Sequence, residues 1–323
     1  MYTMTYEKLV KVISSILLIT CSNSVLAEKS GEDNTHAKVF LNYTQSELDK
    51  NYTQTEWAPN AKQIMDRVSY RSDLTRKSLG NPKIFQYGAS ANEKLDFYKS
   101  SSKNAPLLVF IHGGAWKSGN AKDYDFIANP FLANGISVAI LDFDDVTKVG
   151  LDGMVKQIRT SLKWIYNNSY SLKINKDKIY IAGHSSGAHL AGVITTTNWE
   201  SENLPKGFIK GAVLISGLYD MNPVRLSVRS KYMNFKDKTE IDMSAIKRVE
   251  TINVPLIVSY GSLESDEFKR QSDEFVKKLK DSQKEVKFIM QPYFNHFEIV
   301  EDYGNQYNPL TKMTIEMIRK NKI

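Results

Sequence analysis

The sequence predicts an α/β protein with a mostly parallel central sheet, helices on both faces of that sheet and a small cap. Short, fully apolar runs recur along the chain, as expected for strands that are buried on both faces. These runs are Leu107–Ile111, Ser137–Leu141, Ile179–Ala182, Ala212–Ile215 and Leu256–Ser259. Segments with helical periodicity separate them. This alternation favours parallel strands that are covered by helices on both sides.

Three further strands are predicted at the two ends of this series. Lys83–Tyr87 and Lys94–Lys99 read as two short strands that are joined by a turn at residues 88–90. Val286–Met290 follows the apolar runs as the last strand. The alternating part of the chain therefore begins at about residue 82.

Three amphipathic helices are predicted within and after the strand series. Apolar residues recur at spacings of three and four in segments 155–165, 268–279 and 310–318. The second of these helices begins with acidic residues and ends with lysines, an order that complements the helix dipole. Residues 220–250 break the alternation, and we interpret them as the cap.

The N-terminal residues predict export rather than a part of the fold. A stretch with two lysines precedes an apolar run from Val12 to Thr20, and short or small side chains follow at residues 25–27. This is the organisation of a secretory signal peptide, residues 1–27, cleaved after Ala27. An uncleaved membrane anchor is disfavoured because an apolar run of about nine residues is too short to span a bilayer. Residues 18–21 also resemble a lipoprotein signal, although Thr20 fits poorly before the cysteine.

The predicted mature chain consists of an N-terminal arm, residues 28–80, packed on a catalytic domain, residues 81–323. No repeat, low-complexity tract or Pro/Gly-rich linker divides the catalytic part. Hydrophobic residues make up 41% of the chain and charged residues 24%, which is typical of a soluble globular protein. We therefore expect no stable membrane insertion once the signal is cleaved.

Cysteine and charge exclude several classes of function. Cys21 is the only cysteine and lies within the predicted signal, so the mature chain has no thiol for a disulfide, a nucleophile or a metal site. Export without disulfides fits a secreted or periplasmic bacterial enzyme. The formal net charge of +7 is spread along the chain without a long basic block, so a nucleic-acid partner is not expected.

Residues 183–187, with the sequence Gly-His-Ser-Ser-Gly, follow a predicted strand directly and lead into a helical segment. A serine in this strand–turn–helix context is typical of a nucleophile elbow. The turn is so tight that the residues two before and two after the serine must be small, and Gly183 and Gly187 meet that requirement. Ser185 is therefore predicted to be a nucleophile at a helix N-terminus, where the dipole favours developing negative charge.

A glycine-rich loop follows an earlier strand. Residues 112–116 read His-Gly-Gly-Ala-Trp after the run that ends at Ile111. Consecutive glycines allow the backbone to pass close to a reacting carbonyl. The amides of Gly113 or Gly114, with the amide of Ser186, can form an oxyanion hole in which one donor typically contributes about 3 kcal/mol. Trp116 can either line the substrate pocket or pack in the core.

A general base can be selected from the five histidines by elimination. Three of them lie in the glycine loop, beside the serine or one turn into the following helix, and His36 lies in the arm. The order along the chain in this architecture is serine, acid, histidine. Only His296 lies beyond the remaining strands, in a loop that can reach the top of the sheet. His296 is therefore the predicted base.

The acid of the triad has more than one candidate. Glu264 and Asp266 both follow the strand Leu256–Ser259, and Asp220 follows the preceding strand. We select Glu264 and keep Asp266 as the reserve, since Asp266 at a helix start is also explained as a partner of the helix dipole. Asp220 is a weaker third candidate. The acid would hold the imidazole in one tautomer and stabilise the imidazolium.

Taken together, these motifs resemble the arylformamidase (kynurenine formamidase) branch of the α/β-hydrolases, which grades into bacterial carboxylesterases. The resemblance runs from about Tyr87 to Val300. It rests on residues 87–88, 92–96, 112–116, 183–191, 216–220, 223–226, 261–268, 270–272 and 295–297. It implies an α/β-hydrolase fold with Ser185 as nucleophile, Glu264 as acid and His296 as base. The family commonly carries Asp where this chain has Glu264, and its arylformamidases work in the cytosol.

The predicted reaction is a two-step acyl transfer on a small carboxylic ester or aryl formamide, without a metal or an organic cofactor. Carboxylesterase and arylformamidase activities are not separated by the sequence. An alternative from another class is an inactive hydrolase fold used as a binding module. The sequence makes no prediction of the natural substrate or the oligomeric state.

Overall fold

The computed structural model describes residues 37–321. The predicted signal peptide, including residues 18–21 that resemble a lipoprotein signal, and His36 lie outside the described residues. The chain divides into two compact units, residues 1–46 and residues 47–323. Within the first unit, β1 (Lys38–Phe40) and β2 (Tyr43–Thr44) form an antiparallel pair, and α2 (Gln45–Asn51) begins at its end.

The second unit is built on an eight-stranded sheet with the order β10-β9-β8-β7-β5-β6-β4-β3. The strands are β3 (Lys83–Gln86), β4 (Lys94–Tyr98), β5 (Ala105–Ile111), β6 (Ser137–Leu141), β7 (Ile174–His184), β8 (Ile209–Ile215), β9 (Leu256–Gly261) and β10 (Val286–Gln291). The pairs from β6 to β10 are parallel, whereas β3 and β4 pair antiparallel with each other and β4 with β6. The predicted mostly parallel sheet is confirmed.

Each strand that was predicted from an apolar run is present, with small differences at its ends. The five central runs lie in β5, β6, β7, β8 and β9, and almost all of their residues are buried. The largest difference is β7, which begins at Ile174, five residues before the apolar run. Ile174 is buried, but residues 175–178 are polar and at least partly exposed, so hydrophobicity alone does not reveal this part of the strand.

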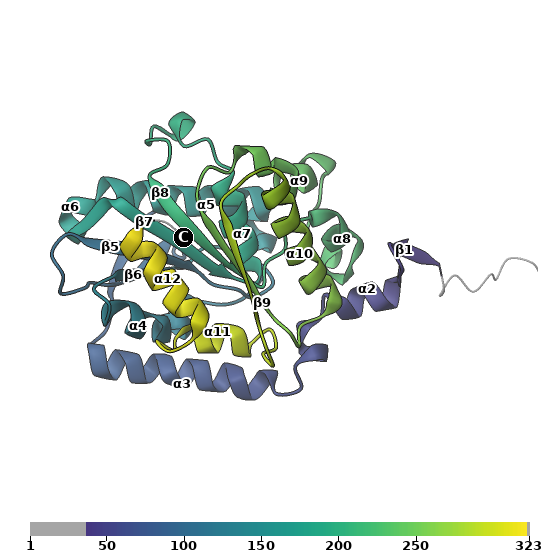
Figure 1. Ribbon diagram of the computed structural model, residues 1–323, viewed down its shortest axis with the longest axis horizontal. Helices are drawn as coiled ribbons and strands as arrows, with labels where there is room; N and C mark the ends of the chain where they lie inside the picture. The colour runs from purple at the N-terminus through teal and green to yellow at the C-terminus, as the bar shows by residue number, and fades with distance from the viewer. Residues whose placement is uncertain (1–36, 322–323) are drawn as a thin grey trace, which may run out of the picture. The chain divides into compact units, whose positions relative to one another are not determined.

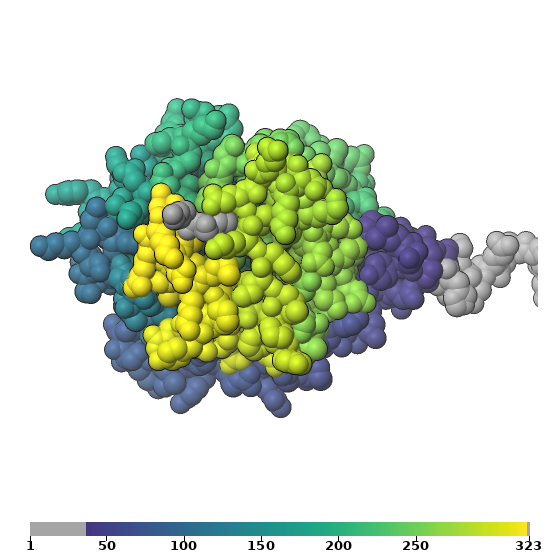
Figure 2. All heavy atoms as spheres, in the orientation of Figure 1, coloured from purple at the N-terminus to yellow at the C-terminus, as the bar shows by residue number. Residues whose placement is uncertain are grey.

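Helices cover both faces of the sheet, and Figure 1 shows several of them around the strands. On one face, η3 (Ala121–Ile127), α4 (Ala128–Leu132), α11 (Glu298–Tyr303) and α12 (Pro309–Lys320) pack on the strands in one continuous core. The aromatic residues buried in this core are Tyr98, Phe110, Phe126, Phe131, Tyr180 and Tyr303. In Figure 2 the yellow atoms of the C-terminal helix form part of the outer surface on this side.

Further helices that follow strands of the sheet are α5 (Val146–Asn167), α6 (Ser169–Leu172), α7 (Ser186–Thr195) and α10 (Asp266–Asp281), and η4 (Glu200–Glu202) lies between α7 and β8. Each residue of α7 is buried, because α7 lies between the sheet and α5. In α10 the predicted charge order is present, with Asp266 and Glu267 in the first turn and Lys278 and Lys280 in the last. Segments 155–165, 268–279 and 310–318 are helical as predicted.

Residues 47–80 belong to the same compact unit as the sheet. They contain η2 (Gln54–Trp57) and the long α3 (Ala61–Leu79), which runs beside α11 in Figure 1. Arg67 of α3 makes a two-pronged ion pair with Glu301, at 2.9 and 2.7 Å, and Gln54 donates to the Ser265 hydroxyl at 3.0 Å. These contacts join the segment to α11 and to the start of α10.

Residues 220–250, which were interpreted as a cap, form four short helical segments: α8 (Met221–Leu226), η5 (Val228–Lys231), α9 (Asp237–Asp242) and η6 (Ala245–Thr251). Asp220 caps α8 by accepting from the Asn222 amide at 3.1 Å.

Among all the helices within residues 37–321, none combines the length and the apolar character that crossing a membrane requires.

Candidate active site

Ser185 occupies a strained turn between β7 and α7. Its φ of 55° and ψ of −123° place the backbone in a region that residues other than glycine rarely adopt. A Cβ on Gly187 would lie 2.1 Å from the Ile111 carbonyl oxygen, and one on Gly183 would lie 2.3 Å from the Gly187 carbonyl oxygen. Both glycines are therefore required for this turn, as the sequence analysis predicted from its tightness.

The structure brings His296 to the serine. The distance between His296 Nε2 and Ser185 Oγ is 2.8 Å, and the distance between His296 Nδ1 and Glu264 Oε2 is 2.7 Å. The exposed fraction is 6% for Ser185, 4% for His296 and 1% for Glu264. Because water is largely excluded, the carboxylate acts strongly on the imidazole across this short distance.

Two further hydrogen bonds hold the second oxygen of Glu264. Glu264 Oε1 accepts from the Ser216 hydroxyl at 2.5 Å and from the Gly261 amide at 2.7 Å. Ser216 itself has a φ of 55° at the end of β8. These two donors hold one oxygen of the buried carboxylate in place and leave the other oxygen for the imidazole. The sequence analysis did not predict this role of Ser216, since a serine after a strand carries no specific signal.

The other two candidate acids lie elsewhere. Asp266 is the first residue of α10, where its side chain is 67% exposed and pairs with Lys269 at 2.9 Å. Asp220 caps α8. Of the three predicted candidates, Glu264 alone hydrogen-bonds to His296.

The glycine loop lies directly beside the serine. A Cβ on Gly113 would come within 3.1 Å of the Ser185 Cβ. Within residues 37–321, the amides of Gly114 and Ser186 donate to no backbone acceptor, whereas the amide of Gly113 bonds to the Tyr124 hydroxyl. Gly114 has a φ of 126°, which suits glycine, and its carbonyl accepts from the amides of residues 117 and 118. Of the amides predicted for an oxyanion hole, those of Gly114 and Ser186 therefore have no backbone partner in the described part of the chain.

His112 holds the glycine loop through a hydrogen bond to its backbone. Its Nδ1 donates to the Gly113 carbonyl at 2.7 Å, and its ring stacks on Phe143 with 4.5 Å between centroids. Burial lowers the pKa of His112 below its usual value, against the raising effect of the Gly113 hydrogen bond. A neutral imidazole with its proton on Nδ1 fits this contact, so His112 supports the loop rather than acting as a base.

His184 contacts both the backbone and the ring of His296. Its Nε2 lies 2.8 Å from the His296 carbonyl oxygen, and the two rings have centroids 4.7 Å apart. Burial and the neighbouring His296 hold the pKa of His184 well below its usual value. The sequence analysis placed His184 only beside the serine and gave it no role. The structure identifies it as the donor that holds the His296 backbone.

Trp116 is buried, with 2% of its surface exposed, and is fixed by a third histidine. Its indole Nε1 donates to His189 Nδ1 at 3.0 Å, and His189 Nε2 lies 3.0 Å from the Met243 carbonyl oxygen. Burial lowers the pKa of His189 to about 4, so its ring is neutral at pH 7 and can donate to one partner while accepting from the other. This chain of contacts connects the glycine loop, α7 and the residues after α9.

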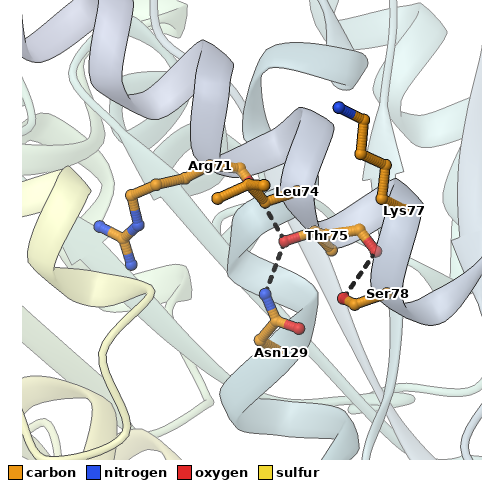
Figure 3. A pocket seen from close by; sticks show the side chains of 6 residues that line it. All are labelled: Arg71, Leu74, Thr75, Lys77, Ser78 and Asn129. Atoms are coloured by element: carbon orange, nitrogen blue, oxygen red, sulfur yellow. Dashed lines mark hydrogen bonds between the residues drawn. The ribbon is translucent and has the colours of Figure 1, made fainter.

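A surface hollow of about 520 Å³ lies on α3, away from these residues. Arg71, Leu74, Thr75, Lys77, Ser78 and Asn129 line it, and Figure 3 shows Asn129 donating to the Thr75 hydroxyl. None of its lining residues belongs to the serine turn, the glycine loop or the His296 loop. Within residues 37–321, no cluster of three or more His, Cys, Asp or Glu side chains is arranged to hold a metal ion.

Comparison with known proteins adds a family and several relatives. The profile of the BD-FAE family matches residues 95–279. Kynurenine formamidase of Danio rerio is 29% identical over 86% of this chain and 97% of its own length, and the Salmo salar enzyme is 28% identical over 85% and 97%. Esterase LipC of Mycobacterium tuberculosis is 24% identical over 67% of this chain and 59% of its own length.

Solved structures give the same architecture. A putative thioesterase from Silicibacter superposes with a TM-score of 0.73 at 21% identity, covering 82% of this chain and 97% of the other. Esterase B from Lactobacillus rhamnosis superposes with a TM-score of 0.63 at 17% identity, covering 84% and 95%. The α/β-hydrolase fold that the sequence predicted is confirmed.

Proposed function

This chain belongs to the BD-FAE family, and on that basis we propose that it is a serine hydrolase that cleaves small carboxylic esters or aryl formamides. The observation that carries the proposal is the continuous hydrogen-bonded series from Ser185 through His296 to Glu264, at 2.8 and 2.7 Å. The relatives named as kynurenine formamidases and esterases support the same class of reaction. We propose Ser185 as nucleophile, His296 as base and Glu264 as acid.

The first step forms an acyl-enzyme. His296 Nε2 takes the proton of Ser185 Oγ, and the oxygen attacks the substrate carbonyl carbon. The carbonyl oxygen becomes negative and accepts from the amides of Gly113 or Gly114 and of Ser186. His296 then gives its proton to the leaving alcohol or amine, and the bond between carbonyl carbon and leaving group breaks. Glu264 stabilises the imidazolium throughout this step.

The second step releases the acid. Water enters in place of the leaving group, His296 takes one of its protons, and the resulting oxygen attacks the acyl-enzyme. Collapse of the second tetrahedral intermediate returns the proton to Ser185 Oγ. The product is a carboxylic acid from an ester, or formic acid from a formamide. The enzyme ends in its starting state.

Ester and formamide cleavage are distinguished by measuring kcat/KM for p-nitrophenyl acetate and for N-formylkynurenine. We expect hydrolysis of at least one of them, together with covalent labelling of Ser185 by a fluorophosphonate, because both need an activated serine. The higher kcat/KM decides between esterase and arylformamidase. A folded protein that is not labelled and hydrolyses neither compound would contradict the proposal and favour the binding-module alternative.

We also propose that the protein is exported and acts as a secreted or periplasmic enzyme. The basic and apolar pattern of the first 27 residues supports export. Mass spectrometry of the protein secreted by its host is expected to find Glu28 as the first residue. A chain that begins at a lipidated Cys21 would instead indicate a lipoprotein, and a retained Met1 would contradict cleavage.

A further inference from the structure

Arg229 is a buried cation in η5 of the cap, with 8% of its surface exposed. Its Nη2 donates to the Tyr52 carbonyl at 2.7 Å, and its Nη1 donates to the Tyr232 hydroxyl at 3.1 Å. The guanidinium carbon lies 5.5 Å from the centroid of the Trp116 ring. All three partners are electrically neutral.

No carboxylate among residues 37–321 forms an ion pair with Arg229, and its Nε finds no hydrogen-bond acceptor there. Other arginines nearby are paired. Arg225, on the same cap, lies 2.5 Å from Asp237 and 3.3 Å from Glu240, and Arg270 donates twice to Glu267. A buried cation without an anion is unfavourable, so the arrangement calls for a negative partner from outside the described chain.

Contacts on two sides of Arg229 lead toward Ser185 and His296. Trp116, beneath the guanidinium, directly follows the glycine loop that lies beside Ser185. On the other side, the ring of Tyr52 lies 6.1 Å from that of Phe268, whose ring in turn lies 5.0 Å from that of His296. Arg229 is therefore linked through packed rings to the glycine loop and to His296, without contacting Ser185, His296 or Glu264 itself.

We propose that Arg229 is a specificity-determining residue that binds a carboxylate carried by the substrate at a distance from the bond that is cleaved. The inference rests on the proposed function and names the class of substrate: anionic esters or formamides. The guanidinium has five N–H donors, of which Tyr52 and Tyr232 use two, so Nε–H and one hydrogen on each terminal nitrogen remain. Two of these suffice for a two-pronged bond to a carboxylate.

Charge balance favours a single carboxylate over a doubly charged group. One buried guanidinium carries one positive charge, which one carboxylate neutralises. Lys117 is exposed, with its Nζ 4.5 Å from the centroid of the Tyr232 ring, so water already solvates its charge and it needs no second bound anion. This exposed cation would attract an anionic substrate, whereas the desolvated Arg229 would discriminate against a neutral one, whose binding leaves the buried charge uncompensated.

The test compares matched pairs of charged and neutral esters. In one pair the carboxylate is on the leaving group (4-acetoxybenzoate and its methyl ester), and in the other it is on the acyl group (4-nitrophenyl hydrogen glutarate and 4-nitrophenyl pentanoate). For Arg229→Gln, the ratio of kcat/KM for the charged ester to that for the neutral ester is expected to fall roughly 10- to 100-fold in at least one pair. The loss should lie mainly in KM, and Arg229→Lys should restore part of it.

Arg225→Gln is the control, because it removes one positive charge from the same cap and leaves Arg229 in place. The ratios of this variant should stay within about twofold of the wild-type ratios, since an exposed charge is screened by salt. Equal losses on charged and neutral esters in Arg229→Gln, or unchanged ratios in both pairs, would overturn the inference and leave Arg229 a structural residue of the cap.

Two outcomes separate this inference from the proposed function. A wild-type protein that hydrolyses the neutral esters but shows no preference for a carboxylate in either pair overturns the inference alone. This measurement needs no variant, so it holds even if Arg229→Gln fails to fold. A folded wild-type protein that hydrolyses none of the four esters, and neither p-nitrophenyl acetate nor N-formylkynurenine, contradicts the proposed function itself.

Discussion

Ser185→Ala is expected to lower kcat for the best ester or formamide substrate by roughly 10⁴- to 10⁶-fold, to near the uncatalysed rate. Without Oγ there is no atom to form the acyl-enzyme, and the 2.8 Å contact to His296 Nε2 disappears. Fluorophosphonate labelling should be lost with the activity. The measurement is the steady-state rate, with the background rate in buffer subtracted.

The folded state should survive this substitution, because it removes one oxygen from a side chain with some exposure. Alanine keeps a Cβ and therefore the same φ of 55° that serine already tolerates. Ser201→Ala, on the exposed η4, is the matched control and should retain wild-type kcat. If Ser185→Ala kept more than a few per cent of the wild-type kcat, a different residue would have to be the nucleophile.

Glu264→Gln is expected to lower kcat roughly 10²- to 10⁴-fold with little change in KM. The amide has nearly the shape of the carboxylate but cannot stabilise the imidazolium. In the wild type, Glu264 Oε1 accepts from Ser216 and Gly261, and Glu264 Oε2 faces His296 Nδ1. The NH₂ group of the glutamine would replace one of these two oxygens, so either the two donors or the imidazole would lose its acceptor. The kinetic constants of the purified variant, with thermal unfolding as a check on folding, measure this effect.

Asp266→Asn is the matched control for the Glu264 prediction. Asp266 is two residues away, pairs with Lys269 and lies in the first turn of α10. Its neutralisation should cost about 0.3–1 kcal/mol of folding stability through the helix dipole and leave kcat close to wild type. If Asp266→Asn reduced kcat as much as Glu264→Gln, the acid assignment would be wrong.

The central strands and the serine turn could be predicted because local physics determines them. Strands buried on both faces must be apolar along their whole length, and this produces the runs in β5, β6, β8 and β9. At the turn, a side chain on Gly183 or Gly187 would collide with backbone atoms, so the requirement for glycine appears directly in the sequence. His296 followed from chain order and from the elimination of the other histidines.

Short helices were less predictable. The segments η3, α4 and α11 are only five to seven residues long, too short for a periodic pattern to be recognised. They are stabilised by packing on the sheet, through residues such as Phe126, Phe131 and Tyr303, rather than by their own sequences. The start of β7 was missed because Ile174, which pairs with Ala105 of β5, is separated from the apolar run by the polar residues 175–178.

By itself, the sequence determined the mostly parallel sheet, the position of the serine in its turn and the order of the reacting groups, because each depends on neighbours along the chain. Only the tertiary structure decided which carboxylate meets His296, and that Ser216 and His184 hold this pair in place. Only the tertiary structure placed the unpaired Arg229 over Trp116. These contacts join residues dozens to more than a hundred positions apart, and their geometry depends on how the strands and loops pack, which no local pattern encodes.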